Sequence, residues 1–292
     1  MRLTLQHGFD RTKIWLDHAE YPGNLDDLRP HCGDVKFTCG QMLYNARWKS
    51  ALEIYQPTLK CLQVLRDVLR DSTVEYQFGE AEIALDLMPL NSRRKLAQHL
   101  GRAFIAAAVP KYHRREALCI KGTWYFERRT KPDQRPRTHV LVVYFDRPSK
   151  LNNQQIDTNT SCCLHIEWRV TGVAAMEKLG LYKIDDLIAF KHEKFWSKHV
   201  HLYALPRKTD LGRFLAGTVN ANVSGTALRK RADRWQQQFT TSSDKSRGQG
   251  QFVLYNALRV AKQRSWERHR TTFKQWLQNA LNCSHGAVYD AP

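Results

Sequence analysis

Apolar and polar residues alternate with a period of two in residues 80–88 and 163–170, and residues 138–145 are dense in β-branched side chains. Each of these patterns predicts a β-strand. Apolar residues spaced three and four positions apart predict helices in the sequence around them. The predicted strands are 53–55, 80–88, 138–145 and 163–170, and the predicted helices are 59–71 and about 91–109. This order of elements predicts an α+β domain.

Composition narrows the class of protein. A chain of 292 residues, 42% hydrophobic and 11% aromatic, can bury a core, which excludes a disordered or collagen-like protein. Its longest apolar run, 103–109, is far shorter than the roughly 20 residues of a membrane span. The seven cysteines include no C-x-x-C pair, which argues against a disulfide framework and against a cysteine zinc site. We therefore expect a cytoplasmic protein without a membrane segment.

Charge is distributed unevenly along the chain. The sequence has 46 Lys and Arg against 28 Asp and Glu, a formal net charge of +18 at pH 7. Half of this excess lies in residues 229–274, where twelve basic residues accompany three acidic ones and the pattern is mostly helical. Such a surplus favours a polyanionic partner, most often nucleic acid. We expect an α+β domain at 1–195 and a basic, mostly helical DNA-binding region at 196–292.

Tryptophans accompany the basic residues of that second region. The mixture suits phosphate contacts combined with stacking on unpaired bases, whereas a solvated helical face with tryptophans in a local core is the structural alternative. The candidate DNA-binding residues here are Arg229, Lys230, Arg231 and Arg234 beside Trp235, and Arg264 and Arg268 beside Trp266.

The three longer predicted strands each carry polar side chains that share a face, because residues two or four apart on a strand point the same way. If the strands are neighbours, their carboxylates suit a hard divalent cation, their arginine suits a phosphate, and their tyrosine suits a nucleophile. A solvated sheet face with a packed tyrosine is the structural alternative. These residues are Glu82 and Asp86 on the first strand, Tyr144 on the second, and His165, Glu167 and Arg169 on the third.

The order of these motifs resembles the replication initiators of filamentous phages, the gene II proteins, and the related rolling-circle Rep proteins of small plasmids and phages. That family has an Arg-Ile-Asp-type strand with a second acidic residue four positions later, then a Thr-Leu-Val-x-Tyr strand. An Arg-Phe-Glu-x-Arg strand follows, and then a helix and a Leu-Gly-Leu-like turn. The corresponding stretches of this chain are 80–86, 138–144, 165–169 and 179–181, and the resemblance spans roughly residues 50–190.

The resemblance implies a fold and an activity. The fold is a central antiparallel sheet with flanking helices, as in rolling-circle Rep nucleases, followed by the basic region. Tyr144 is the implied nicking nucleophile, which attacks origin DNA, forms a 5′-phosphotyrosyl intermediate, frees a 3′-hydroxyl and later religates the strand. Implied partners are duplex and single-stranded origin DNA, a host helicase and polymerase, and a second copy of the chain, in the cytoplasm of a bacterial host.

The resemblance also implies ligands for the chemistry. A divalent cation, Mg²⁺ or Mn²⁺, would be held by the carboxylates and the histidine of the first and third of these strands in sequence order. Basic residues near the tyrosine would contact the DNA backbone. The implied metal ligands are Glu82, Asp86, Glu167 and His165, and the implied phosphate contacts are Arg147, Lys150 and Arg169.

Several alternatives stay open. Glu80 stands where the family has arginine and Asp146 where it often has lysine, so the chain is alternatively a catalytically inactive DNA-binding replication or control protein of the same fold. An RNA-binding protein is a weaker third option. His199-Val200-His201 resembles the metal-binding pair of another branch of rolling-circle nucleases, with a basic surface loop as the structural alternative. A single nucleophile does not explain a second cleavage, for which either a second tyrosine such as Tyr125 or a second protomer is needed.

Overall fold

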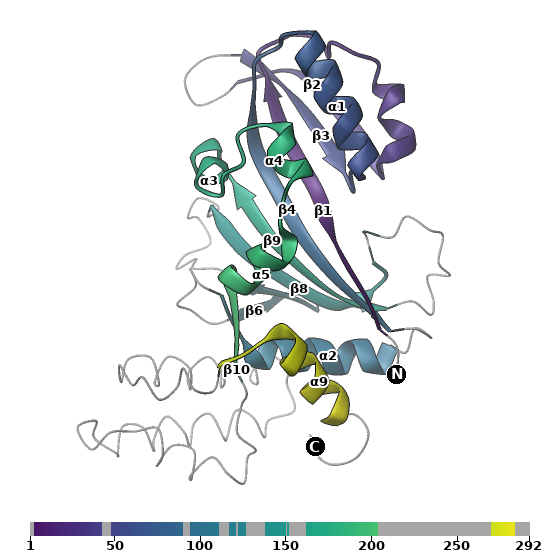
Figure 1. The fold of residues 1–292 in the computed structure, drawn as a ribbon, viewed down its shortest axis with the longest axis vertical. Coiled ribbons are helices and arrows are strands. Elements are labelled where there is room, and N and C mark those ends of the chain that lie inside the picture. The colour runs from purple at the N-terminus through teal and green to yellow at the C-terminus, as the bar shows by residue number, and fades with distance from the viewer. Residues whose placement is uncertain are drawn as a thin grey trace, which may run out of the picture.

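The computed structural model describes residues 3–42, 48–89, 94–110, 117–120, 122–126, 138–149, 151, 162–203 and 270–283. These residues form an α+β fold built on an eight-stranded sheet in the order β2-β3-β1-β4-β9-β8-β7-β6 (Figure 1). All of its strand pairs are antiparallel, which confirms the expected central antiparallel sheet. A second, three-stranded sheet has the order β11-β10-β5.

The elements have the following bounds. The strands are β1 (Leu3–Leu16), β2 (Asp34–Met42), β3 (Trp48–Tyr55), β4 (Tyr76–Pro89), β5 (Ala108–Pro110), β6 (Ala117–Ile120), β7 (Thr123–Phe126), β8 (His139–Arg147), β9 (Cys163–Thr171), β10 (Val200–Tyr203) and β11 (Arg270–Thr271). The helices are η1 (Leu25–Asp27), η2 (Arg29–His31), α1 (Leu59–Asp71), α2 (Arg94–Ala107), α3 (Val173–Lys178), α4 (Ile184–Ile188), α5 (His192–His199) and α9 (Phe273–Cys283).

The elements predicted from periodicity are all present. The four predicted strands lie within β3, β4, β8 and β9, and the two predicted helices correspond to α1 and α2. Helix α2 ends at Ala107 instead of about residue 109, because the next residues form β5 and pair with β10. The Leu-Gly-Leu-like stretch forms the turn after α3, where Gly180 adopts a φ of 79° that favours glycine.

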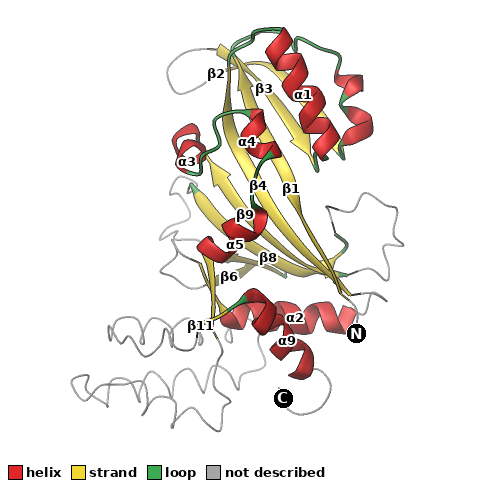
Figure 2. Ribbon diagram, in the orientation of Figure 1, coloured by secondary structure: helices red, strands yellow, loops and turns green. Residues whose placement is uncertain are grey.

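The main sheet has one apolar face and one polar face. Its apolar side chains form a single buried core with those of helices α1, α2, α3, α4 and α5, and Trp168 of β9 is fully buried within it. Figure 2 shows α1, α4 and α5 lying along the sheet and α2 at its lower end. Burial of that face supplies most of the driving force for folding. Polar side chains of the sheet therefore gather on the opposite face.

A β-bulge in β1 changes which residues face the core. Phe9 pairs with Ile83 and Arg11 pairs with Glu82, so Asp10 is the extra residue between the two pairs. The bulge moves the inward-facing set from odd to even numbers, and Ile14 is accordingly buried beyond it. This irregularity breaks the period-two pattern of a 14-residue strand, and β1 was not predicted from the sequence.

The last described residues pack on the α+β part of the chain. Strand β10 pairs with β5, and His99 of α2 contacts the backbone carbonyl of Ala280 in α9 at 2.8 Å. The division of the chain into 1–195 and 196–292 stays a prediction. Among the described helices, none is long and apolar enough to cross a membrane.

Helix α2 approaches the sheet most closely at Gly101, which provides a test of this packing. A Cβ built at Gly101 would clash with the ring and the Cβ of Phe145 in β8. We expect Gly101→Ala to lower the free energy of unfolding by about 1–3 kcal/mol, because overpacking outweighs the gain of about 1 kcal/mol in helix propensity. Urea unfolding measures this change. Lys60→Ala, at an exposed site of α1, should change stability by less than about 0.5 kcal/mol, and equal stability of both variants would contradict this packing.

A second test concerns acid stability. His192 at the start of α5 packs its ring 5.1 Å from that of Phe9 and 4.9 Å from that of Phe190. Burial, and then the neighbouring His7, lower its pKa from 6.5 to about 4. The unfolded chain therefore binds a proton near pH 6.5 that the folded chain excludes until about pH 4, so stability is complete above this window and is lost as the pH falls through it.

We expect the folded state to lose about 2 kcal/mol from this group between about pH 7 and pH 4.5. Urea unfolding at both pH values measures the total loss, to which carboxylates also contribute. His192→Gln removes only the contribution of His192 to this loss, so the variant should lose less stability than the wild type on acidification. The same loss in both proteins would show that His192 is not buried in its neutral form.

Candidate active site

The three strands with the predicted site residues are neighbours in the sheet, as expected. Strand β9 lies between β4 and β8. One row across the three strands therefore contains Asp86, His165 and Tyr144, which are paired in the strand register. In the same sheet face, Glu167 lies two residues further along β9 and pairs with Ala84 of β4. Residues up to 81 positions apart in the sequence thus converge on one patch.

His165 connects the acidic and aromatic residues of this patch. Its Nδ1 lies 2.5 Å from Oδ1 of Asp86, and its Nε2 lies 3.3 Å from Oε2 of Glu167. Its ring stacks on the phenol ring of Tyr144, with centroids 4.4 Å apart and planes 21° from parallel. The hydroxyl of Ser149 donates a hydrogen bond to the other carboxylate oxygen of Asp86. The imidazole is therefore held by partners on both nitrogens and on one face.

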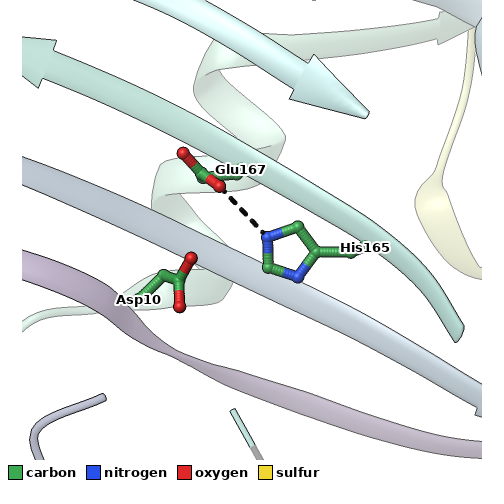
Figure 3. Close-up of side chains that lie close together, drawn as sticks. All are labelled: Asp10, His165 and Glu167. Carbon is green, nitrogen blue, oxygen red and sulfur yellow. Dashed lines mark hydrogen bonds and ion pairs between the residues drawn. The ribbon is translucent and has the colours of Figure 1, made fainter. Parts of the chain in front are cut away.

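Asp10, which the sequence patterns did not single out, joins this patch from the bulge in β1. Asp10, His165 and Glu167 each offer one ligand atom, and these three atoms lie within 4.8 Å of one another (Figure 3). The side-chain amide of Gln56 donates to Oδ1 of Asp10 at 2.7 Å, and its backbone N–H donates to the Asp10 carbonyl at 2.9 Å. Gln56 has a φ of 44°. The turn after β3 therefore directs the Asp10 carboxylate.

The ionisable groups of the patch are removed from solvent. Asp86, His165 and Glu167 have no exposed surface, and Asp10 is 2% exposed. Burial by itself would lower the pKa of His165, but its contacts with Asp86 and Glu167 raise that pKa to about 9. Burial likewise opposes ionisation of Glu167, yet His165 and Arg169 bring its pKa down to about 2. The patch therefore holds a buried imidazolium beside the ionised carboxylate of Glu167.

Tyr144 is as deeply placed as its neighbours. Its side chain is 3% exposed. Burial, followed by the charges of Asp10, Glu167 and Asp86, raises the pKa of its phenol well above the usual value. A positive charge placed among these carboxylates would oppose that shift and favour the phenolate.

Glu82 occupies the edge of the patch, between two arginines. Its Oε1 lies 3.1 Å from Nη2 of Arg11 and 3.5 Å from Nε of Arg169, and Arg169 also forms an ion pair with Glu167. Burial, and then Glu167, raise the pKa of Glu82 to about 7. Of the four predicted metal ligands, His165 and Glu167 belong to the three-residue group. Asp86 contacts His165 from outside this group, and Glu82 is linked to Glu167 through Arg169. No second such group occurs among the described residues.

The basic residues predicted to contact DNA fall into two sets. Arg147 lies beside the site, with its guanidinium carbon 5.3 Å from the centroid of the Tyr144 ring, and its side chain is half exposed. Arg169 reaches into the site as described above. The remaining predicted residues lie outside the described part of the chain: Lys150, Arg229, Lys230, Arg231, Arg234, Arg264 and Arg268.

The His199-Val200-His201 stretch does not form a pair on one strand. His199 is the last residue of α5, whereas His201 lies in β10. His199 is buried, its Nδ1 contacts the backbone carbonyl of Phe195 at 2.9 Å, and its ring stacks on that of Phe195. The expectation of a basic surface loop is thus wrong for His199, because helix α5 packs it against the core. The described residues provide no metal group at this place.

Comparisons with known proteins give little beyond this geometry. No protein-family model matches the chain, and no curated protein is significantly similar to it. Among solved structures, the chain is similar to a rolling-circle replication initiator protein from Geobacillus stearothermophilus. The TM-score is 0.34 and the sequence identity 10%, over 70% of this chain and 89% of that chain. The similarity is weak, and the function proposed below rests on the residues of this chain.

The three-residue group fits a divalent cation. Two carboxylates and one imidazole are ligands that Mn²⁺ accepts readily, and the carboxylates also suit Mg²⁺. If Nε2 of His165 is the ligand atom, the ring must give up the proton on that nitrogen when a cation binds. Asp86 on Nδ1 then fixes the ring orientation and makes the neutral imidazole a better ligand. Asp86 is therefore a positioning residue in this arrangement.

The role of Asp10 can be tested by calorimetric titration with MnCl₂. Asp10→Asn keeps the size of the side chain and an oxygen for Gln56, but it removes the negative charge. We expect it to weaken Mn²⁺ binding by at least about tenfold. Asp146→Asn, which changes an acidic residue of β8 outside the three-residue group, should leave the affinity within about twofold. Equal affinities for the wild type and Asp10→Asn would remove Asp10 from the site.

Proposed function

We propose that this protein is a rolling-circle replication initiator that nicks one strand of origin DNA by transesterification onto Tyr144. The observation that carries the proposal is the stacking of Tyr144 on His165, within the patch that also holds Asp10, Asp86 and Glu167. A phenol, an arginine and a divalent-cation group on one sheet face suit attack on a phosphodiester.

Each step of the proposed reaction is assigned to residues of this chain. Arg169 and Arg147 supply positive charge for the DNA backbone on either side of the tyrosine. The phenol oxygen of Tyr144 attacks the scissile phosphorus in line, the bond to the 3′ oxygen breaks, and a 3′-hydroxyl is released. The phenol passes its proton to water as it attacks, and the leaving 3′ oxygen takes up a proton from water. The negative charges of Asp10, Glu167 and Asp86 oppose ionisation of the phenol. The phosphotyrosyl bond keeps the energy of the phosphodiester, so a 3′-hydroxyl can later reverse the step.

A bound cation would supply what these side chains lack. Held by Asp10, His165 and Glu167, Mg²⁺ or Mn²⁺ would neutralise charge on the phosphate and offset the carboxylates that oppose ionisation of the tyrosine. The burial of Tyr144 also means that residues covering the site must move before DNA can enter. Ser149 and Leu151 belong to this cover, because Ser149 contacts Asp86 and Leu151 packs against Gly8 of β1.

The nucleophile can be identified with a pool of random-sequence, single-stranded oligonucleotides that carry a label at the 3′ end. In the presence of Mn²⁺, wild-type protein should become covalently labelled on a denaturing gel, because the 5′-phosphotyrosyl product keeps the 3′ part of the strand. We expect Tyr144→Phe to lower the rate of first labelling by at least about a hundredfold, since phenylalanine keeps the ring stack but removes the attacking oxygen.

Tyr182→Phe is the matched control, because Tyr182 is 63% exposed and lies after α3, away from the patch. It should label at the wild-type rate. If the wild-type protein binds single strands but never becomes labelled, the alternative holds, and the chain is a catalytically inactive DNA-binding replication or control protein. The strong effect of burial on Tyr144 is the observation that favours this alternative.

A further inference from the structure

A second tyrosine lies on the same sheet face, one strand further from β9. In β7, Trp124 and Phe126 point into the apolar core, and Tyr125 between them therefore points to the polar face. Tyr125 pairs with Val142 of β8, and Val142 pairs in turn with Glu167 of β9. A single small side chain thus separates Tyr125 from the acidic patch.

The two tyrosines are diagonal neighbours. Tyr144 lies two residues beyond Val142 on β8, so it shares a face with Tyr125 and lies one register step away. Diagonal positions on adjacent strands are about 7–8 Å apart, within reach of two long side chains directed at one phosphate path. Arg169 interacts electrostatically with both Glu167 and Tyr125, which places one guanidinium near both the patch and the second phenol.

The two phenols differ in access. Tyr144 is 3% exposed and stacks on His165, whereas Tyr125 is partly exposed. A strand attached to Tyr144 therefore leaves the second phenol facing solvent and incoming DNA. In the proposed reaction, a nucleophile that is already joined to DNA cannot attack again, so a second cleavage requires a second nucleophile. A site with one buried and one accessible phenol supplies both.

We propose that Tyr125 is a second attacking residue, which cleaves the next strand while Tyr144 still carries the first. This inference rests on the proposed function. The phenol oxygen of Tyr125 attacks the phosphorus of a second copy of the site, its proton passes to water, and the bond to the 3′ oxygen breaks. The released 3′-hydroxyl then attacks the Tyr144 phosphodiester, joins the two strands and returns Tyr144 to its free form. Two phosphodiesters are consumed and two are formed at each exchange.

A two-label experiment with the full-length protein tests this step. Protein is first loaded with a selected oligonucleotide labelled at its 3′ end, and then receives the same sequence with a second label at its 3′ end. In the wild type, tryptic mass spectrometry should find the first label on Tyr144 before the second oligonucleotide is added. Afterwards the second label should be on Tyr125 and the first in the joined strand, which should form at a rate independent of protein concentration. Tyr125→Phe should lower the ratio of joined strand to first adduct by at least about tenfold.

Tyr182→Phe serves as the matched control, since Tyr182 is 63% exposed and lies after α3, away from the patch. It should keep the wild-type ratio. A second label found only on Tyr144 of another protomer, with a rate that rises with protein concentration, would overturn the inference and leave the proposed function intact. Absence of any labelled protein would overturn the proposed function itself. A first label on Tyr125 would reverse the order of the two attacks and overturn the inference as stated.

Discussion

The burial of four ionisable groups side by side is the constraint on which this structure depends. Asp10, Asp86, His165 and Glu167 lie on three adjacent strands with almost no exposed surface. A buried charge is tolerated only when partners compensate for lost hydration. Here the imidazole of His165 contacts the carboxylates of Asp86 and Glu167, and Glu167 in turn contacts Arg169. Removing one member leaves its partner charged and unpaired, so the side chains are fixed to each other as well as to the sheet.

The backbone beside this chain of contacts is irregular at Asp10. The bulge at Asp10 adds a carboxylate that regular pairing of β1 would have directed elsewhere. On the same face, β1 and β4 carry the small residues Gly8 and Ala84, which pair with each other, and Leu151 rests against Gly8. The carboxylates of the site therefore lie beside small side chains of the sheet, and Ser149 and Leu151 cover part of this face. The helices on the opposite face stabilise the sheet without occupying the site.

Two tyrosines lie on adjacent strands of this face, Tyr144 on β8 and Tyr125 on β7. The stack between Tyr144 and His165 couples one phenol to the cation group, whereas Tyr125 lies nearer to solvent and to Arg169. In the reaction we propose, this arrangement would separate a protected covalent intermediate from an accessible acceptor. A sheet suits that proposal because adjacent strands hold side chains at fixed spacings.

The sequence alone determined the elements with strong periodicity and the residues that share a face within each one. Alternation in β4 and β9 predicted which residues turn away from the core, and the role proposed for Tyr144 came from the resemblance of residues 138–144 to a family motif. Tertiary structure alone decided that these strands adjoin, that their polar residues are buried, and that Asp10 joins them. Strand order and bulges arise from pairing between distant segments, and a local pattern carries no information about such pairing. In β1, the bulge itself disrupted the alternation by which the strand would have been recognised.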